Sequence, residues 1–340
     1  MANPPAASAP RFNPAEVPDK SRKGFSLHVA RLGDGSILRV AVNVVAGEGP
    51  RPCLALVAGI HGDEYDGILA LTELWEELDP KEITGRVAIV PCANPTAFAA
   101  GQRKSPLDGL DLNRTFPGKP RGQPSEQLAY CLFHDVLKQV DFVFSMHGWT
   151  AYGDVVPYVE FKHDNPATAR ASFDAAAASG FDIVRIGSWS PGVMTREASV
   201  AGIPGMESEV GGMGMTSAEN RERYKGYVRR LMAHLGMIKA PAAAPQPAKP
   251  RVVEHMDIFS PVGGVVRLRV RLGEDVTRGT VLATVHNFHG ESRHEIIAPD
   301  SGIIAMTRVS GSVQPGDMMF RMFRDVANPL AAAPPRKRKP

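Results

Sequence analysis

Apolar runs alternate with amphipathic stretches through the first two thirds of the chain. Three of the runs are rich in apolar side chains, as strands are when both of their faces are buried: 52–60, 85–93 and 139–147. The stretches 68–78 and 125–139 instead repeat apolar residues three and four positions apart, which is the spacing of one helix face. This alternation predicts an α/β fold, with a parallel or mixed sheet flanked by helices.

After residue 250 the pattern changes to short strands that occur in two similar halves. The segment 260–285 aligns with 298–322, and each half holds a proline, a glycine, short strands and a valine in a glycine-flanked turn. Two such halves resemble the biotinyl/lipoyl-like barrel-sandwich fold, which implies a small all-β domain. A carrier domain presents a lysine between its halves, but "HNFHGESRHEI" (286–296) has none. We therefore expect an accessory domain that shapes an active site or an oligomer contact.

Stretches rich in proline and alanine separate these parts. "KAPAAAPQPAKP" has the composition of an extended linker, and both ends of the chain are similarly biased. We therefore expect five segments: a disordered leader (1–24), a catalytic domain (25–238), a linker (239–250), a β barrel-sandwich domain (251–325) and a disordered basic tail (326–340).

Composition excludes several classes of function. The chain of 340 residues has a formal net charge of +3, but four positive charges lie together in the tail "RKRK". Without them 35 basic residues face 36 acidic ones, which argues against a nucleic-acid-binding surface. No apolar run reaches the roughly eighteen residues that a membrane span needs. We expect a protein that binds neither nucleic acid nor membrane.

The cysteines bear on the cellular compartment. There are three, widely spaced and each in an apolar setting, and no CxxC pair occurs: Cys53, Cys92 and Cys131. An odd count of this kind predicts buried free thiols in a reducing compartment. The first 24 residues also make a poor secretory signal, because they lack a long apolar core. We expect a cytoplasmic protein.

Polar side chains gather where the predicted strands end. His61, Asn94, His147 and Glu209 each follow an apolar run, and functional groups of α/β sheets collect on the loops at the carboxyl ends of strands. His61 and Glu64 are three residues apart at the start of a predicted helix, so their side chains share one face. Catalytic Zn²⁺ takes three protein ligands and a water, and His147 is the natural third. A lone H-x-x-E is weak evidence for a metal, and the alternative is a loop with solvated charges.

Other histidines are weaker candidates. His286, His289 and His294 could form a metal cluster, but solvated hairpin residues are the simpler interpretation. His255 follows the linker, and we expect it on the surface.

The irregular segment "GQRKSPLDGLDLNRTFPG" (101–118) concentrates Arg103, Asn113 and Arg114. Long irregular loops inside compact domains are often functional. Arginine binds carboxylates in a bidentate way, so Arg114 with Asn113 could hold an acidic substrate and Arg103 could stabilise an oxyanion. The alternative is a loop tied down by salt bridges to Asp108 and Asp111.

The stretch "IPGMESEVGGMGMT" ends a predicted strand with two acids. Glu207 and Glu209 alternate with apolar residues, so both side chains fall on one strand face. Either could act as general base beside a zinc-bound water. Alternatively, both are surface carboxylates on an edge strand.

The order of these motifs is more specific than any of them alone. H-x-x-E, N-P-x-A-F with a following Arg, "LNRxFPG", a strand-terminal His and E-x-G-G resemble the succinylglutamate desuccinylase/aspartoacylase family, among the zinc carboxypeptidase-like hydrolases. The resemblance covers roughly residues 25 to 325 and includes the C-terminal domain. Within the family, "SPxDGLxLNRxFPG" is most similar to the N-acetyl-diaminobutyrate deacetylase branch.

The resemblance implies an activity and a role for each site residue. The activity is zinc-dependent hydrolysis of the amide bond in a small N-acyl amino acid or related carboxylate-bearing amide, and the alternative is a metallo-carboxypeptidase. One Zn²⁺ per chain and a homo-oligomer, a dimer or higher, are implied as well. The implied roles are zinc ligands (His61, Glu64 and His147), polarisation of the scissile carbonyl (Arg103), grip on the substrate carboxylate (Asn113 and Arg114) and acid–base catalysis (Glu209).

The chain departs from the family pattern beside the third ligand. Many relatives read D-x-H-S-G there, whereas this chain reads "SMHGW", with Ser145 in place of the acid. The sequence therefore does not identify the groups that orient His147. Trp149 could form an aromatic wall for a larger acyl group, or pack in the core.

Overall fold

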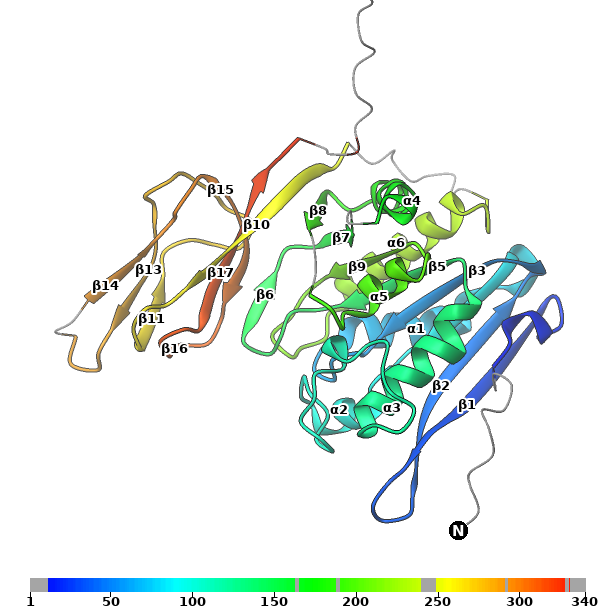
Figure 1. The fold of residues 1–340 in the computed structure, drawn as a ribbon. Helices are drawn as coiled ribbons and strands as arrows, with labels where there is room; N and C mark the ends of the chain where they lie inside the picture. Colours follow the sequence, from blue (N-terminus) through cyan, green and yellow to red (C-terminus); the bar gives the residue numbers. More distant parts are fainter. Residues whose placement is uncertain are drawn as a thin grey trace, which may run out of the picture.

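In the computed structural model one long mixed sheet runs through most of the molecule (Figure 1). The structure describes residues 12–162, 165–187, 190–239, 249–290, 293–327 and 330. Within the body the strands are β1 (Ser21–Arg31), β2 (Ile37–Ala46), β3 (Glu48–Ala58), β4 (Thr84–Val90), β5 (Phe142–His147), β6 (Gly153–Val155), β7 (Tyr158–Lys162), β8 (Ile183–Gly187) and β9 (Gly205–Glu209).

The strand order in the body is β1-β2-β4-β3-β5-β9-β7-β8. β4, β3, β5 and β9 are parallel neighbours, so their carboxyl ends lie along one edge. β1 and β2 are antiparallel at one side, and β7 pairs antiparallel with β9. The predicted α/β fold with a mixed sheet is therefore confirmed.

Helices cover both faces of the body's sheet, which explains the continuous apolar runs. Along β3, Leu54, Leu56 and Ala58 join one buried cluster, whereas the alternate residues Ala55 and Val57 join the other. The first cluster also contains residues of α1 (Tyr65–Glu77), α4 (Pro166–Ala178) and α6 (Ala218–His234). The second contains residues of α3 (Pro124–Cys131) and α5 (Met194–Val200). A short helix, α2 (Pro95–Ala100), follows β4.

The segment 125–139 differs from the single helix that its spacing predicts. It begins in α3, continues as a π-helical turn (Leu132–Val136) and ends as a 3₁₀ turn (Leu137–Gln139). The wider turn keeps adjacent apolar residues on the buried side: Leu132, Phe133, Val136 and Leu137 all belong to the second cluster.

The C-terminal region forms a small all-β domain, as the internal repeat predicts. Its strands are β10 (Arg251–Phe259), β11 (Gly264–Leu268), β12 (Asp275–Val276), β13 (Val281–His286), β14 (Arg293–Ile297), β15 (Gly302–Arg308), β16 (Ser312–Val313) and β17 (Met318–Asp325). A four-stranded sheet of order β14-β13-β11-β16 faces the remaining strands, and a separate apolar cluster fills the space between them.

The sheet of the body continues into this domain. β10 pairs in parallel with β8 and antiparallel with β17, and β6 of the body pairs with β15. A further apolar cluster, which includes Tyr158, Val253 and Phe323, spans the junction. The two regions are thus joined by backbone hydrogen bonds as well as by buried side chains.

The prediction of a disordered leader over residues 1–24 is wrong for its C-terminal part, from residue 12 onward. Phe12 is fully buried and packs edge to face against Phe25, with ring centroids 5.1 Å apart. A short 3₁₀ helix (Pro14–Glu16) follows, and β1 begins at Ser21. An aromatic side chain and a strand therefore attach this segment to the body. Most of the expected linker (240–248) and most of the tail lie outside the described residues.

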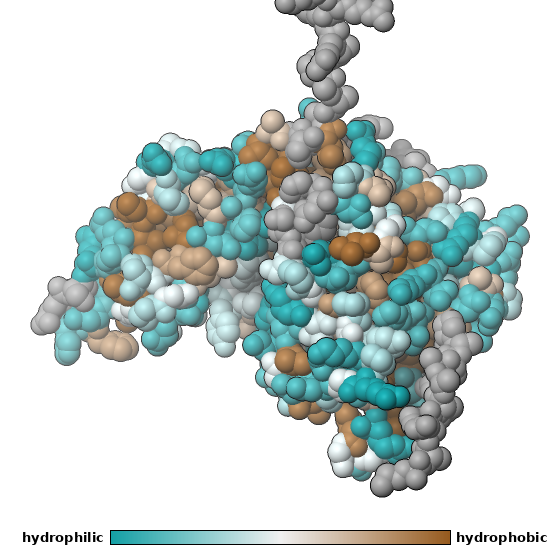
Figure 2. Space-filling model, viewed as in Figure 1, coloured by the Kyte–Doolittle hydropathy of each residue, from teal (hydrophilic) through white to brown (hydrophobic). Residues whose placement is uncertain are grey.

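Hydrophilic side chains predominate on the face drawn in Figure 2, with hydrophobic patches over the C-terminal domain and near its junction with the body. Among the described helices, none is both long and apolar enough to cross a membrane.

Candidate metal centre and active-site pocket

Three potential metal ligands meet at the carboxyl edge of the sheet. His61 follows β3, Glu64 is the residue before α1, and His147 ends β5. One Glu64 oxygen lies 2.7 Å from Nδ1 of His61, and the other lies 2.8 Å from Nδ1 of His147. One ligand atom from each residue can be chosen so that all three lie within 4.8 Å of one another. They converge because β3 and β5 are parallel neighbours.

Close packing shapes the turn that carries His61. A Cβ atom at Gly62 would lie 2.0 Å from the backbone of Ala97, so the loop and α2 can approach only at a glycine. Gly59 has a φ of +65°, which also favours glycine. The "GIHG" stretch thus holds His61 at the end of its strand.

The electrostatics of this group favour bound positive charge. Burial alone would raise the pKa of Glu64, but the neighbouring His61 and His147 hold it well below its usual range. Burial alone would lower the pKa of His147, but Glu207 and Glu64 raise it to about 10. Two imidazoles and one carboxylate are a donor set that suits Zn²⁺ in a catalytic site. The residues present therefore fit the metal.

A second set of groups orients the two histidines. Ser145 Oγ lies 2.8 Å from Nε2 of His147, and Glu207 Oε1 lies 3.8 Å from the same nitrogen. Asp111 Oδ1 lies 3.2 Å from Nε2 of His61. Such outer contacts fix ring orientation and tautomer in metal sites. With serine at position 145, the carboxylate nearest to His147 on this side comes from the adjacent strand.

The irregular loop at 101–118 is tied to the ligand group. Arg103 donates to Asp111 over 3.1 Å and lies 3.5 Å from Glu64. These contacts combine the two interpretations of the loop, because the salt bridge to Asp111 aims Arg103 at the ligands. Burial opposes its charge, but Glu64 and Asp111 raise the pKa of Arg103 above its usual value.

Asn113 and Arg114 lie beside each other in a 3₁₀ turn (Leu112–Arg114), but their environments differ. Asn113 is buried; its amide donates to Glu207 over 3.4 Å and accepts from the backbone N–H of Met194 over 2.9 Å. Arg114 is exposed and donates to the Asn113 carbonyl over 2.7 Å. Among the described residues no carboxylate forms an ion pair with Arg114, so its guanidinium is available to a ligand.

Glu207 and Glu209 both face the pocket, as alternation predicts, but they are bound differently. Glu207 accepts from Asn113 and, over 2.9 Å, from Thr195 Oγ1. Glu209 pairs in the sheet with His147, and its buried Oε2 has no hydrogen-bond partner among the described residues. Burial, reinforced by Glu64, raises the pKa of Glu209 well above its usual value. Glu209 is therefore the acid with an open oxygen.

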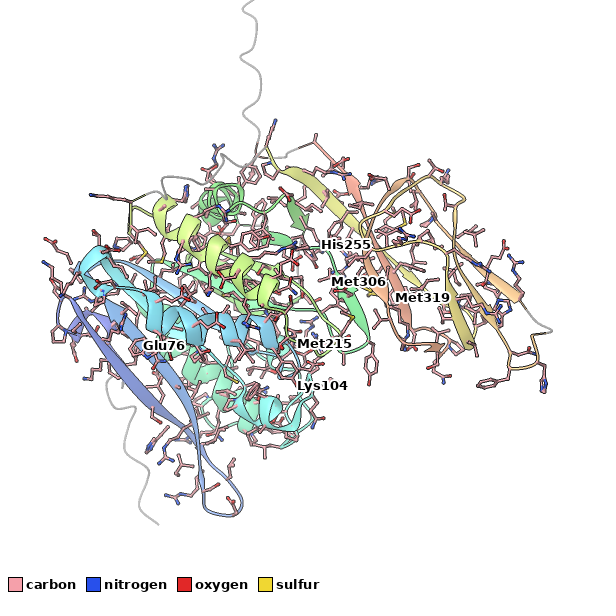
Figure 3. The ribbon with its side chains drawn as sticks, turned by 180° about the vertical axis from the view of Figure 1, so that it is seen from behind. Glu76, Lys104, Met215, His255, Met306 and Met319 are labelled. Carbon is pink, nitrogen blue, oxygen red and sulfur yellow. The ribbon has the colours of Figure 1, made fainter. Side chains whose placement is uncertain are left out.

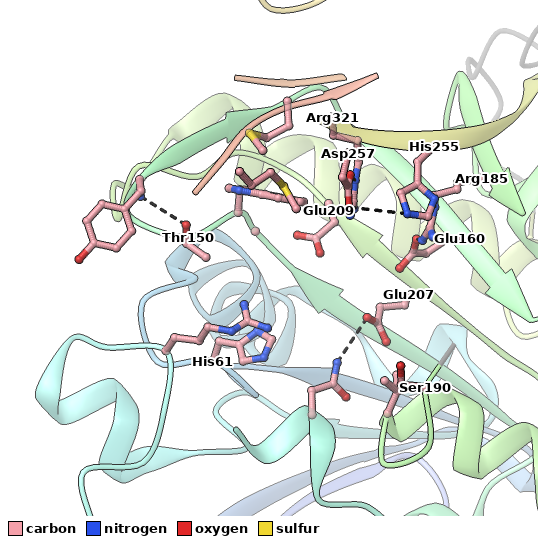
Figure 4. Close-up of a pocket in the computed structure, with 18 of the residues that line it drawn as sticks. His61, Thr150, Glu160, Arg185, Ser190, Glu207, Glu209, His255, Asp257 and Arg321 are labelled. Atoms are coloured by element: carbon pink, nitrogen blue, oxygen red, sulfur yellow. Dashed lines mark hydrogen bonds and ion pairs between the residues drawn. The ribbon is translucent and has the colours of Figure 1, made fainter. Parts of the chain in front are cut away.

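These groups line a cavity of about 580 Å³ (Figure 4). His61, Arg103, Asn113, Arg114 and Glu209 contribute to its surface, while Glu64 and His147 lie beneath. The sequence-predicted site residues are thus brought together around one space.

The C-terminal domain supplies one side of the cavity, which is one of the two roles expected for it, but sequence reasoning did not identify the residues that do so. This C-terminal wall comprises His255, Asp257, Met306, Arg308, Met318 and Arg321. Figure 3 shows His255 and Met306 where the domain meets the body. The only signal in the sequence is the alternation that puts His255 and Asp257 on one face of their strand.

A row of charged side chains crosses the junction between the body and the C-terminal domain. Arg185 forms an ion pair with Glu160 and donates to Nδ1 of His255 over 3.0 Å. His255, which we expected on the surface, lines the cavity with its side chain 33% exposed; burial and the nearby Arg185 lower its pKa to about 4. Arg321 stacks on Trp149, with its guanidinium carbon 4.9 Å from the ring centroid. Trp149 thus serves both as pocket wall and as packing.

Comparison with known proteins agrees with this geometry. Residues 50–235 match the model of the succinylglutamate desuccinylase/aspartoacylase catalytic domain. The chain is 30% identical over 294 residues to the N-alpha-acetyl-L-2,4-diaminobutyric acid deacetylase of Halomonas elongata, covering 83% of this chain and 84% of that protein.

Solved structures resemble the whole molecule. A succinylglutamate desuccinylase/aspartoacylase from Rhodobacter sphaeroides superposes with a TM-score of 0.83 at 26% identity, covering 92% of this chain and 98% of that one. The product-bound ectoine utilization protein of Ruegeria pomeroyi gives a TM-score of 0.82 at 27% identity, covering 92% and 99%.

Proposed function

Because the chain belongs to the succinylglutamate desuccinylase/aspartoacylase family, we propose that it is a zinc-dependent deacylase that hydrolyses the amide bond of a small N-acyl amino acid. The observation that carries the proposal is the convergence of His61, Glu64 and His147 beside Glu209, whose buried Oε2 lacks a partner among the described residues.

The proposed chemistry divides between a metal and one carboxylate. Bound by the three ligands, Zn²⁺ would supply Lewis acidity toward the amide carbonyl and make water more acidic. Glu209 would accept a proton from the attacking water at its open oxygen and deliver it to the leaving amine nitrogen. The raised pKa of Glu209 favours the delivery of the proton, whereas its acceptance requires the carboxylate, which the positive charge of a bound metal would favour.

Two arginines would position the substrate. Arg103, held by Asp111, would donate to the carbonyl oxygen as negative charge develops there. Arg114, which has no ion-pair partner among the described residues, would bind the substrate carboxylate. The side chain of Asn113 is occupied by Glu207 and Met194, so its contribution would be the one remaining amide hydrogen and the placement of Arg114.

The named relatives support a small substrate. One is an N-alpha-acetyl-diaminobutyric acid deacetylase and another an ectoine utilization protein, and the cavity of about 580 Å³ has the C-terminal wall as one side. A metallo-carboxypeptidase is the alternative, but it must admit an extended peptide. We propose a cytoplasmic location, and the three free cysteines support it.

A hydrolysis screen with zinc present tests the proposal. Its substrates are N-acetyl, N-succinyl and bulkier N-acyl amino acids, with free peptides beside them. We expect release of the amino acid from some N-acyl compounds and no turnover of peptides. Turnover of peptides alone would establish the carboxypeptidase instead.

The Glu209→Gln variant tests the assigned acid and base. It should lose about 10²-fold or more in kcat. Glu219→Gln is the control, because Glu219 is exposed and its contact is a surface ion pair with Arg223. Equal rates for both variants would remove Glu209 from the mechanism.

A further inference from the structure

We propose that Asp257 of the C-terminal wall is a specificity-determining residue, which neutralises Arg321 and so bars substrates with a second carboxylate. The inference rests on the proposed function and deepens it. Its ligand class is an N-acyl amino acid with one carboxylate, whose remaining parts are neutral or positively charged.

The first support is that the guanidinium groups away from Arg114 are already matched by carboxylates. Arg321 donates to Asp257 through two parallel hydrogen bonds of 2.7 and 2.9 Å. The other pairs lining the cavity are Arg103 with Asp111, Arg185 with Glu160, and Arg308 with Asp317. Arg114 is the one lining arginine for which the described chain offers no acidic partner, so one substrate carboxylate finds a free cation.

The second support is the geometry of the Asp257–Arg321 pair. The two residues face each other across β10 and β17, and Arg321 also donates to Tyr158 Oη over 3.1 Å. Trp149 covers the plane of the guanidinium. The side chains of Asp257 and Arg321 are only 18% and 13% exposed. A bidentate ion pair with so little exposure to solvent is strong. A ligand carboxylate would have to displace Asp257 in order to bind Arg321.

The third support is the presence of carboxylates beside the paired arginines. Glu160, Glu207 and Asp257 line the same cavity, and each lies near an arginine or histidine that it already partners. Figure 4 shows Glu209 between the metal end and the Asp257–Arg321 pair. A second carboxylate of the substrate would therefore approach carboxylates and no unmatched guanidinium. A neutral or cationic group meets no such opposition, and like charges placed together are a common means of rejecting a wrong ligand.

Binding to the zinc-loaded Glu209→Gln variant measures this selectivity without turnover. The probes are N-acetylalanine, which has one carboxylate, and N-acetylaspartate and N-succinylalanine, which have two. We expect N-acetylalanine to bind about tenfold or more tightly than either dicarboxylate, which corresponds to about 1.4 kcal/mol. Similar affinities for all three compounds would overturn the proposal.

Two further substitutions should shift the selectivity in opposite directions. Asp257→Asn frees Arg321, so the affinity for dicarboxylates relative to N-acetylalanine should rise about tenfold. Arg321→Gln leaves Asp257 unmatched, so the same ratio should fall. Glu254→Gln is the matched control, because Glu254 pairs with Arg324 across the same two strands but is half exposed on the opposite face.

Melting temperatures show whether each variant is folded. If Asp257→Asn does not fold, Arg321→Gln decides the proposal alone. An unchanged ratio in every folded variant would overturn it. Because binding is compared without hydrolysis, the result is separate from the proposed function, which fails if the wild-type protein turns over no N-acyl amino acid.

Discussion

His147 is held from two sides. Its Nδ1 faces Glu64 and its Nε2 faces Ser145 and Glu207. Glu207 also holds the amide of Asn113, next to the proposed carboxylate-binding Arg114. One buried carboxylate thus connects a metal ligand with the substrate loop.

Glu207→Gln should weaken zinc binding, because the neutral glutamine side chain lacks the negative charge with which Glu207 orients and polarises His147. We expect a loss of roughly 10- to 100-fold in affinity, measured by competition between the metal-free protein and a chelator. Ser208→Ala is the control, since the Ser208 side chain points away from the pocket toward Tyr224. If both variants retain wild-type affinity, Glu207 has no orienting role.

The residue types of the site were predictable to different extents. His61, Glu64 and His147 follow from a sequence rule, because parallel strands end at one edge and ligands collect there. The position of Glu207 depends on the register that pairs it with Ser145 across β5 and β9, and no local pattern encodes that register. The Asp257–Arg321 pair likewise depends on the register of β10 and β17.

Among the elements of the body, β4 carries a charge in the middle of a buried sheet. Arg86 is 2% exposed and donates to the backbone carbonyls of Pro14, Val17 and Gly47, and to the carboxylate of Asp19. These contacts attach the segment before β1 to the sheet. The sequence shows an arginine at the start of an apolar run but not the carbonyls that satisfy it.

Arg86→Met should therefore destabilise the fold, since several buried carbonyls lose their donor. We expect the free energy of unfolding to fall by about 2–5 kcal/mol in urea denaturation. Arg51→Met is the matched control: its ion pair with Asp141 is about half exposed, and such pairs contribute about 0–1 kcal/mol. Equal losses in the two variants would contradict the structural role of Arg86.

At the scale of the whole molecule, the C-terminal domain is part of the enzyme and not an appendage. β10 continues the sheet of the body, and the C-terminal wall completes the cavity. The internal repeat predicted the small β domain. The pairing of β10 with β8 was not predictable, because α5, β9, α6 and the linker separate the two strands along the chain, and the composition of the linker says nothing of direction.

Removal of residues 239–340 should therefore damage the body. The truncation uncovers the edge of β8 and the apolar cluster around Tyr158, so we expect aggregation, a lower melting temperature and loss of hydrolysis. Size-exclusion chromatography, thermal unfolding and the amide hydrolysis assay measure these effects. A soluble truncated protein with wild-type kcat/KM and substrate selectivity would contradict the integration of the two regions.

The proposed function depends on a zinc ion held by His61, Glu64 and His147. The most direct measurement is a titration of metal-free protein with Zn²⁺ while hydrolysis of an N-acetyl amino acid is followed. Calcium is the control metal, because it prefers oxygen ligands. We expect no hydrolysis without metal, a linear rise that ends at one zinc per chain, and no rise with calcium. Full activity in the metal-free protein, or none with zinc on any N-acyl amino acid, would contradict it.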